Sequence, residues 1–318
     1  MSAQAAGSKN VGVPARVRWR LSPRSAKPDA LKPAGLWIVA LLMVAAATPS
    51  RADRKVMDEL GRVVVVPDHP NRIVCLIPSV VDDVYSLGAG QNVVAISDFT
   101  KYPAAAKSKP SIGLPMSPSL EAIVALHPDL VVGSGKINNI ESVRQLTSYG
   151  IAVFMLDPHG LQGVYTSLLI LGSALNREDS AHALVVRLKE REGEVRARAA
   201  QHSPIRVFMP VWYDPIVTIG KGSFISDLVE TAGARSITND ISQEWPQVSL
   251  EAVIARKPDA LLLVRSGKFS LRDLQQRPGW NTLDAVRTGR VFYLDDRVEY
   301  PSPVAFDALE DLAKQLYP

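Results

Sequence analysis

The chain has 318 residues, of which 47% are hydrophobic and 21% are charged. This composition excludes intrinsic disorder, and the length is sufficient for a substantial core and two domains of ordinary size. The formal net charge is +4, but the first 33 residues carry seven basic side chains and one acid, so the remainder sums to about −2. Because the excess of basic residues lies in this N-terminal segment, the net positive charge does not indicate nucleic-acid binding.

Residues 1–52 have the pattern of an export signal with a long basic n-region. The apolar run Ala34 to Ala47 is short for a helix that spans hydrocarbon, and small residues at Ser50 and Ala52 suit a signal peptidase. The mature chain is therefore expected to begin near Asp53 and to be periplasmic. An uncleaved N-terminal anchor and a start codon further along remain alternatives. No cysteine lies just after the apolar run, so no lipid anchor is expected.

After Arg72, short apolar strands alternate with amphipathic helices, which is typical of an α/β fold with mostly parallel sheets. The first half predicts strands over 72–77, 93–96, 130–132 and 152–156 and helices over 80–87, 121–126, 140–149 and 161–175. The alternation repeats over 206–210, 224–232, 250–255, 260–264, 271–276 and 291–294, and a closing helix is predicted over 304–317. The sequence thus predicts two comparable Rossmann-like lobes.

The segment between them, Arg177 to Gln201, has no proline and carries charges on most turns. Its apolar positions Ala183, Leu184, Val186 and Leu188 recur at helical spacing and predict a long helix with one wet face. The expected organisation is an N-terminal lobe over 53–175, a linker helix over 176–203 and a C-terminal lobe over 204–318. A helical linker resists bending, so we expect modest lobe closure on ligand binding.

An internal repeat relates the two lobes. SLEAIVALHPDLVV begins at Ser119 and SLEAVIARKPDALL begins at Ser249, 130 residues later, with seven of fourteen positions identical. In each copy the serine is expected to cap a helix, and Glu121 or Glu251 lies in its first turn, where an acid complements the helix dipole. Taken singly, each glutamate is explained by this local effect. Taken together, the two glutamates predict equivalent negatively charged surface positions, one on each lobe.

The sequence lacks complete motifs for catalysis or metal binding. The glycines near Lys221 lack phosphate-loop spacing, the Leu87 to Gly90 segment lacks the third glycine of a dinucleotide fingerprint, and no nucleophile elbow occurs. The five histidines are scattered, although His159 follows a predicted strand and could approach a cleft. The single cysteine, Cys75, lies in an apolar run and permits no internal disulfide. The sequence therefore favours a binding protein over an enzyme, with an exported α/β enzyme as the rival.

The order and spacing of several segments resemble the periplasmic binding proteins of cobalamin, haem and iron-siderophore ABC importers, in which a rigid helix joins two lobes. The resemblance covers the mature chain from NRIVCLIPS to GRVFYLDD and is nearest to the cobalamin-binding member, above all at WPQVS, Trp245 to Ser249. It implies that Glu121 and Glu251 dock onto arginines of the membrane permease. It also implies a cleft lined by Tyr102, Trp212, Tyr213, Trp245 and Asp296.

The resemblance implies capture of cobalamin or a related corrinoid as transported ligand, with no resident cofactor and no metal site, and delivery to an importer permease and its ATPase. Three positions depart from the cobalamin pattern. Pro115 and Ser134 stand where the pattern has cleft tryptophans, and Val304 replaces an arginine. These changes alter the expected cleft surface, so haem and ferric siderophores remain alternative ligands.

Overall fold

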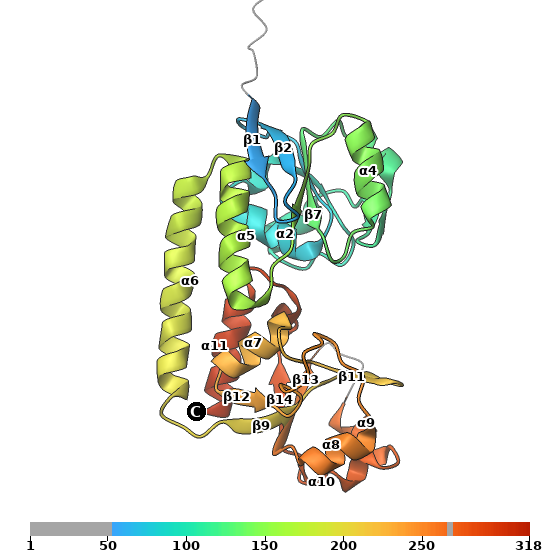
Figure 1. Cartoon of the computed structure of the whole chain (residues 1–318), viewed down its shortest axis with the longest axis vertical. Helices are drawn as coiled ribbons and strands as arrows, with labels where there is room; N and C mark the ends of the chain where they lie inside the picture. The colour runs from blue at the N-terminus through green and yellow to red at the C-terminus, as the bar shows by residue number, and fades with distance from the viewer. Residues whose placement is uncertain (1–52, 266–269) are drawn as a thin grey trace, which may run out of the picture. The chain divides into compact units, whose positions relative to one another are not determined.

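The computed structural model describes residues 53–265 and 270–318, which form two α/β lobes connected by the long helix α6, Glu178–Ala199 (Figure 1). This arrangement confirms the predicted fold class. The predicted export signal, residues 1–52, lies outside the described residues. No helix in the described ranges is both long and apolar enough to cross a membrane.

The N-terminal lobe is built on a parallel four-stranded sheet with the strand order β4-β3-β7-β8. Its strands are nearly continuous buried apolar runs, as expected for a parallel sheet covered by helices. The strands are β3 (Ile73–Cys75), β4 (Val93–Ile96), β7 (Leu130–Ser134) and β8 (Val153–Leu156), and the helices are α2 (Pro78–Ser86), α3 (Leu120–Ala125), α4 (Ile140–Ser148) and α5 (Gly160–Leu175).

The C-terminal lobe repeats this topology with the strand order β12-β9-β13-β14, again parallel. In both sheets the order along the chain is second, first, third, fourth, so the repeat seen in the sequence is also a repeat of topology. The strands are β9 (Ile205–Phe208), β12 (Ala234–Ser236), β13 (Ala260–Val264) and β14 (Val291–Leu294), and the helices are α7 (Phe224–Thr231), α8 (Leu250–Arg256), α9 (Leu271–Gln276), α10 (Asp284–Arg287) and α11 (Ala305–Leu316).

Short antiparallel hairpins add to this scheme and were not predicted. The predicted strand over 206–210 is two strands, because the chain breaks at Met209 and continues as one arm of a hairpin. The hairpins are β1 (Asp53–Met57) with β2 (Val63–Pro67), β5 (Gly113–Leu114) with β6 (Ser117–Pro118), and β10 (Pro210–Tyr213) with β11 (Ile216–Thr218). The short 3₁₀ helices are η1 (Gly90–Asn92), η2 (Ala104–Ser108), η3 (Trp280–Thr282) and η4 (Asp296–Glu299).

The buried face of α6 differs from the predicted one. Ala183 and Val186 are exposed, whereas the buried positions are Ala181, Leu184, Val185, Leu188 and Val195. The first four of these have the spacing i, i+3, i+4, i+7 of a single helical face. The prediction was wrong at Ala183 and Val186 because the neighbouring helices cover only that stripe.

The two lobes share one continuous hydrophobic core, which runs through α5, α6, α7 and α11. A second, smaller cluster lies within the C-terminal lobe. Arg191 on α6 also pairs with Asp307 and Glu310 on α11, at 2.6 and 2.5 Å. Because dense cores resist continuous deformation, this shared packing favours small rather than large movements of the lobes.

Candidate ligand-binding cleft

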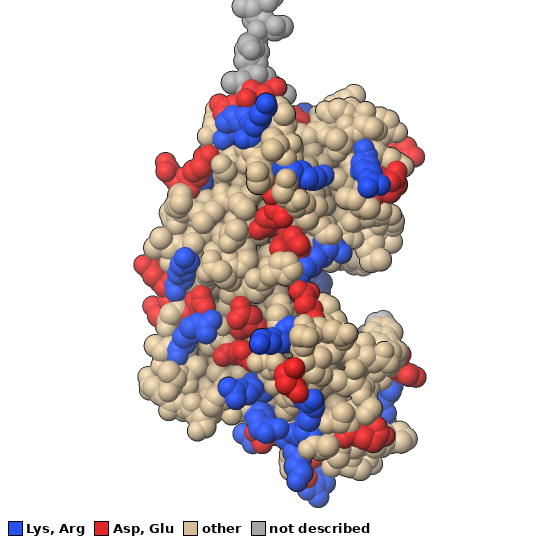
Figure 2. Space-filling view, viewed as in Figure 1, with Lys and Arg blue, Asp and Glu red and all other residues tan. Residues whose placement is uncertain are grey.

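A cavity of about 830 Å³ lies between the two lobes, at the carboxyl ends of their parallel strands. This volume is in the range of small-molecule sites, and open α/β sheets bind ligands at this edge. Figure 2 shows a notch between the two lobes, and the visible wall of this notch carries mainly uncharged residues. The cavity is lined by residues 77–80, Asp83, Phe99, Pro115, Ser134, Lys136, Ile137, Leu156, Pro158, residues 209–212, Phe224, Ile225, Glu244, Trp245, Val264 and residues 299–301.

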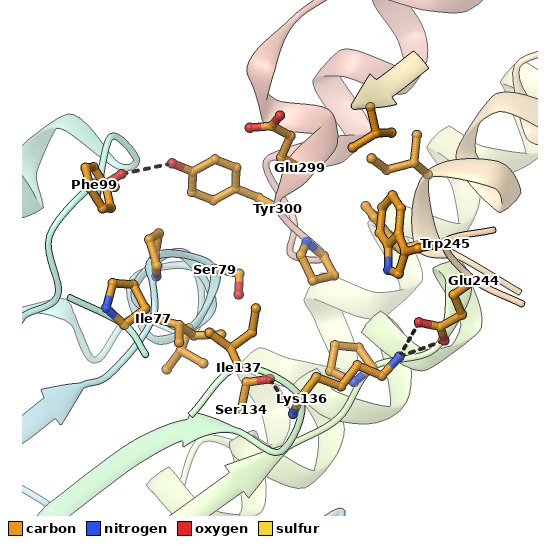
Figure 3. Close-up of a pocket in the computed structure, with 18 of the residues that line it drawn as sticks. Ile77, Ser79, Phe99, Ser134, Lys136, Ile137, Glu244, Trp245, Glu299 and Tyr300 are labelled. Carbon is orange, nitrogen blue, oxygen red and sulfur yellow. Dashed lines mark hydrogen bonds and ion pairs between the residues drawn. The ribbon is translucent and has the colours of Figure 1, made fainter. Parts of the chain in front are cut away.

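Large aromatic side chains form much of the wall. Trp212 and Trp245 are 49% and 47% exposed, and Phe99 is 70% exposed at a positive φ of 64°. Tyr300 is buried, and its hydroxyl donates to the Phe99 carbonyl at 3.2 Å, which ties the two sides together (Figure 3). Exposed aromatic groups gathered on one concave surface are typical of a site for a large, flat, partly apolar ligand.

Only some of the residues predicted to line the cleft do line the cavity. Trp212 and Trp245 line the cavity. Tyr102 and Asp296 are not among its lining residues; instead the Tyr102 hydroxyl donates to the Asp296 carboxylate at 2.8 Å across the two lobes. Lys101 forms an ion pair with the same carboxylate. These residues therefore form a contact between the lobes beside the cavity.

Tyr213 is a correction to the prediction. It lies on strand β10, not in a loop, and its ring packs edge-on against Trp280 at 5.7 Å while the Arg277 guanidinium lies over it at 4.2 Å. Successive residues of a strand point to opposite faces. Because Trp212 faces the cavity, Tyr213 faces the core of the C-terminal lobe.

A second polar contact crosses the cleft and was not predicted from the sequence. Lys136, which follows β7, forms an ion pair with Glu244 of the other lobe at 2.8 Å (Figure 3). Burial alone would raise the pKa of Glu244, but the hydrogen bond and charge of Lys136 outweigh it and lower the pKa. His159 Nδ1 lies 3.3 Å from the Glu244 carboxylate, so this histidine does approach the cleft mouth.

The positions that depart from the cobalamin pattern also bear on the cleft. Pro115 and Ser134 both line the cavity, so the replacement of two tryptophans changes the surface that a ligand meets. Val304 is not a lining residue; its backbone N–H donates to Asp82 at 2.8 Å.

Glu121 and Glu251 occupy equivalent places on α3 and α8. Ser119 and Ser249 each cap their helix by accepting from the N–H three residues later, at 3.2 Å in both copies. Both glutamates are exposed and neither lines the cavity. Hydrogen bonds from its own backbone and from Ser249 lower the pKa of Glu251, which keeps it ionised.

Helix α2 carries two buried carboxyl groups, at Asp82 and Asp83, which are 6% and 3% exposed. Burial raises the pKa of both, and the neighbouring carboxyls of Asp82 and Glu59 raise that of Asp83 further. Asp83 lines the cavity. In the described part of the chain, no group of three or more His, Cys, Asp or Glu side chains is arranged to hold a metal ion.

Comparison with known proteins agrees with this geometry. The model of the periplasmic binding protein family matches residues 73–298. The chain is a member of the periplasmic binding protein family. This membership places it among substrate-binding components of ABC transporters and indicates a site of action outside the cytoplasm.

Two curated relatives and one solved structure illustrate the range of this periplasmic binding protein family. An uncharacterized ABC transporter substrate-binding lipoprotein of Bacillus subtilis is 29% identical, over 90% of this chain and 98% of the relative. A vitamin B12-binding protein of Pectobacterium atrosepticum is 30% identical, over 61% and 71%. A periplasmic haem-binding protein of Roseiflexus has the same fold, with a TM-score of 0.71, 24% identity and coverage of 78% and 98%.

Proposed function

We propose that this periplasmic binding protein captures cobalamin or a related corrinoid in the cavity between its lobes and delivers it to an ABC importer. The observation that carries the proposal is the aromatic, largely apolar wall of the cavity, with Trp212 and Trp245 both about half exposed. A rigid macrocycle fits such a wall because stacked rings bury much apolar area at little cost in conformational entropy.

The partners are the permease and its ATPase. Glu121 and Glu251 support docking of the protein onto the permease, because both are exposed and lie on equivalent helices of the two lobes. Neither lines the cavity, so docking would not block it. Complementary charges at an interface chiefly set orientation and encounter rate. The leader over 1–52, read as a signal peptide without a lipobox cysteine, would deliver the chain to the periplasm. The bound corrinoid is cargo, and no resident cofactor or metal is proposed.

Haem or a ferric siderophore is the second candidate ligand. The observation in its favour is the loss of two cleft tryptophans relative to the cobalamin pattern, since Pro115 and Ser134 both line the cavity. A haem-binding protein of the same fold supports this alternative. An exported enzyme is the more distant alternative, and measured turnover of a bound compound would favour it.

Titration of the purified protein from Asp53 onward, which has Trp212, Trp245 and Trp280, with cyanocobalamin, haemin and a set of ferric siderophores tests the proposal through tryptophan fluorescence. Saturable quenching by cyanocobalamin is expected, because Trp212 and Trp245 face the cavity while Trp280 is buried in the C-terminal lobe. Replacing Trp212 and Trp245 by phenylalanine should remove most of the quenching and leave the Trp280 signal. Saturation by haemin or a siderophore alone would transfer the proposal to that ligand.

A further inference from the structure

An ion pair inside the cavity joins the two lobes. Lys136 follows β7 of the N-terminal lobe, and its Nζ lies 2.8 and 3.2 Å from the two carboxylate oxygens of Glu244 in the C-terminal lobe (Figure 3). Both residues line the cavity, and their side chains are 37% and 31% exposed. Because neither side chain is fully buried, a molecule that fills the cavity can contact both.

Lys136 is the single basic side chain among the described residues that line the cavity. The other charged residues of this lining are acids, namely Asp83, Glu244 and Glu299. Beside the cavity, Lys101 is also paired, with the carboxylate of Asp296. An anionic ligand would therefore find no unpaired cation among these residues.

The pair remains ionised although it is partly buried. Burial would raise the pKa of Glu244, but the hydrogen bond and the charge of Lys136 outweigh burial and lower this pKa. Glu244 is therefore a carboxylate at neutral pH and offsets the charge of Lys136. Seen from the cavity, the two side chains together carry no net charge.

The pair also lies where the ligand is expected to bind. Glu244 directly precedes Trp245, whose ring lines the cavity and is 47% exposed. Consecutive Cα atoms are about 3.8 Å apart. Figure 3 shows Trp245 and Glu244 on the same wall, with Lys136 facing Glu244. A macrocycle that stacks on Trp245 would bring the polar groups of its rim close to the ion pair.

Charged and uncharged ligands meet this pair on different terms. A ligand that covers the pair removes water from it, and a lone charge loses more by this than two opposite charges in contact. An uncharged ligand leaves Lys136 and Glu244 paired. A ligand carboxylate could bind Lys136 only in competition with Glu244, whose charge repels it. The pair therefore favours an uncharged ligand rim over one with carboxylates.

We propose that Glu244 is a specificity-determining residue: by neutralising Lys136, it makes the cavity select a ligand with uncharged polar groups over one with carboxylates. This inference rests on the proposed function and deepens it, because the rim of a corrinoid carries uncharged carboxamides whereas haem carries carboxylates. A single substitution that removes the charge of Glu244 should therefore weaken the discrimination against haem.

The first test is Glu244→Gln in the purified protein from Asp53 onward. Glutamine keeps the shape of the side chain and an acceptor for Lys136 but leaves the positive charge of Lys136 free. Haemin should bind this variant about 10-fold more tightly than it binds the wild type, and added salt should reduce the gain. The affinity for cyanocobalamin should change by less than about threefold. Titrations monitored by ligand absorbance give both dissociation constants.

Lys136→Met separates the effect of charge from a structural role of the ion pair. Each single substitution breaks the pair, so a pair that only held the lobes together would change the haemin affinity in the same direction in both variants. The proposal expects opposite directions, with a gain in Glu244→Gln and a loss in Lys136→Met, which leaves Glu244 unpaired. The double variant again has no net charge at this place and should bind haemin about as the wild type does.

Glu141→Gln is the matched control for net charge. Glu141 on α4 is exposed, pairs with Arg144 and does not line the cavity, so its substitution should leave both affinities unchanged. Thermal unfolding checks that the variants fold. Because the Lys136–Glu244 pair is only partly buried, all of them should unfold within about 4 °C of the wild type.

Three results would overturn the inference. An unchanged haemin affinity in Glu244→Gln, or an equal gain in Glu141→Gln, refutes the role of Glu244 and leaves the proposed function intact. A gain that persists in the double variant shows that Lys136 is not the group that Glu244 neutralises. Absence of cyanocobalamin binding by the wild-type protein refutes the proposed function and this inference with it.

Discussion

Replacing Glu121 and Glu251 together by lysine is expected to abolish uptake of the ligand by cells while the purified protein keeps its ligand affinity within about twofold. Both acids are exposed in the first turns of equivalent helices, and neither lines the cavity. Reversing both charges changes the charge of this pair by four units, which would oppose the basic permease surface that the docking proposal requires. Uptake of labelled ligand in a strain that lacks its own copy measures the first quantity, and fluorescence titration measures the second.

A matched control comes from two other first-turn acids, Glu141 on α4 and Asp284 on α10. Each is exposed, and within residues 53–265 and 270–318 its side chain pairs only with an arginine three residues later, a surface contact that contributes little. The Glu141→Lys, Asp284→Lys double variant should transport normally. Loss of ligand affinity in the Glu121, Glu251 variant, or uptake equal to that of the control, would show that these glutamates do not form the docking pair.

Trp245→Ala should weaken ligand binding by roughly 30- to 1000-fold, the effect of truncating an aromatic residue at the centre of an interface. The side chain is 47% exposed in the unliganded cleft and belongs to the segment between β12 and α8, where it can cover a macrocycle. Trp245→Phe keeps an aromatic ring and should lose much less. The measurement is the dissociation constant from titration monitored by ligand absorbance, which does not depend on the tryptophan signal.

Tyr149→Ala serves as the control for Trp245→Ala. Tyr149 is also a large exposed aromatic residue, at 64%, but it ends α4 and does not line the cavity. Its removal should leave the dissociation constant unchanged. An equally small effect of Trp245→Ala would mean that the aromatic wall does not hold the ligand.

Local signals in the sequence predicted much of the fold. The Ser-Leu-Glu-Ala repeat predicted both the capped helices and the equivalence of the two lobes, because caps and first-turn acids act within a few residues. The buried stripe of α6 was predicted only in part. Charged residues surround it on all sides, and the neighbouring helices, not the sequence period alone, decide which apolar positions are covered.

The cleft was harder to predict because its contacts join distant residues. Lys136 and Glu244 are 108 residues apart, and no local pattern connects them. Trp212 and Tyr213 are adjacent aromatic residues on one strand, so alternation predicts that only one faces the cleft, while the register that selects Trp212 is set by the hairpin with β11. Asp83 did leave a signal, two consecutive acids inside the apolar segment VVDDVY, which is unusual for a buried helix.

Equilibrium dialysis of the purified protein against labelled cyanocobalamin shows whether the interlobe cavity binds a corrinoid. Saturable retention of one corrinoid per chain is expected, displaced by excess unlabelled corrinoid and unaffected by an equal excess of haemin. Retention that does not saturate, or complete displacement by haemin at equal concentration, would contradict the assignment of the interlobe cavity as a corrinoid site.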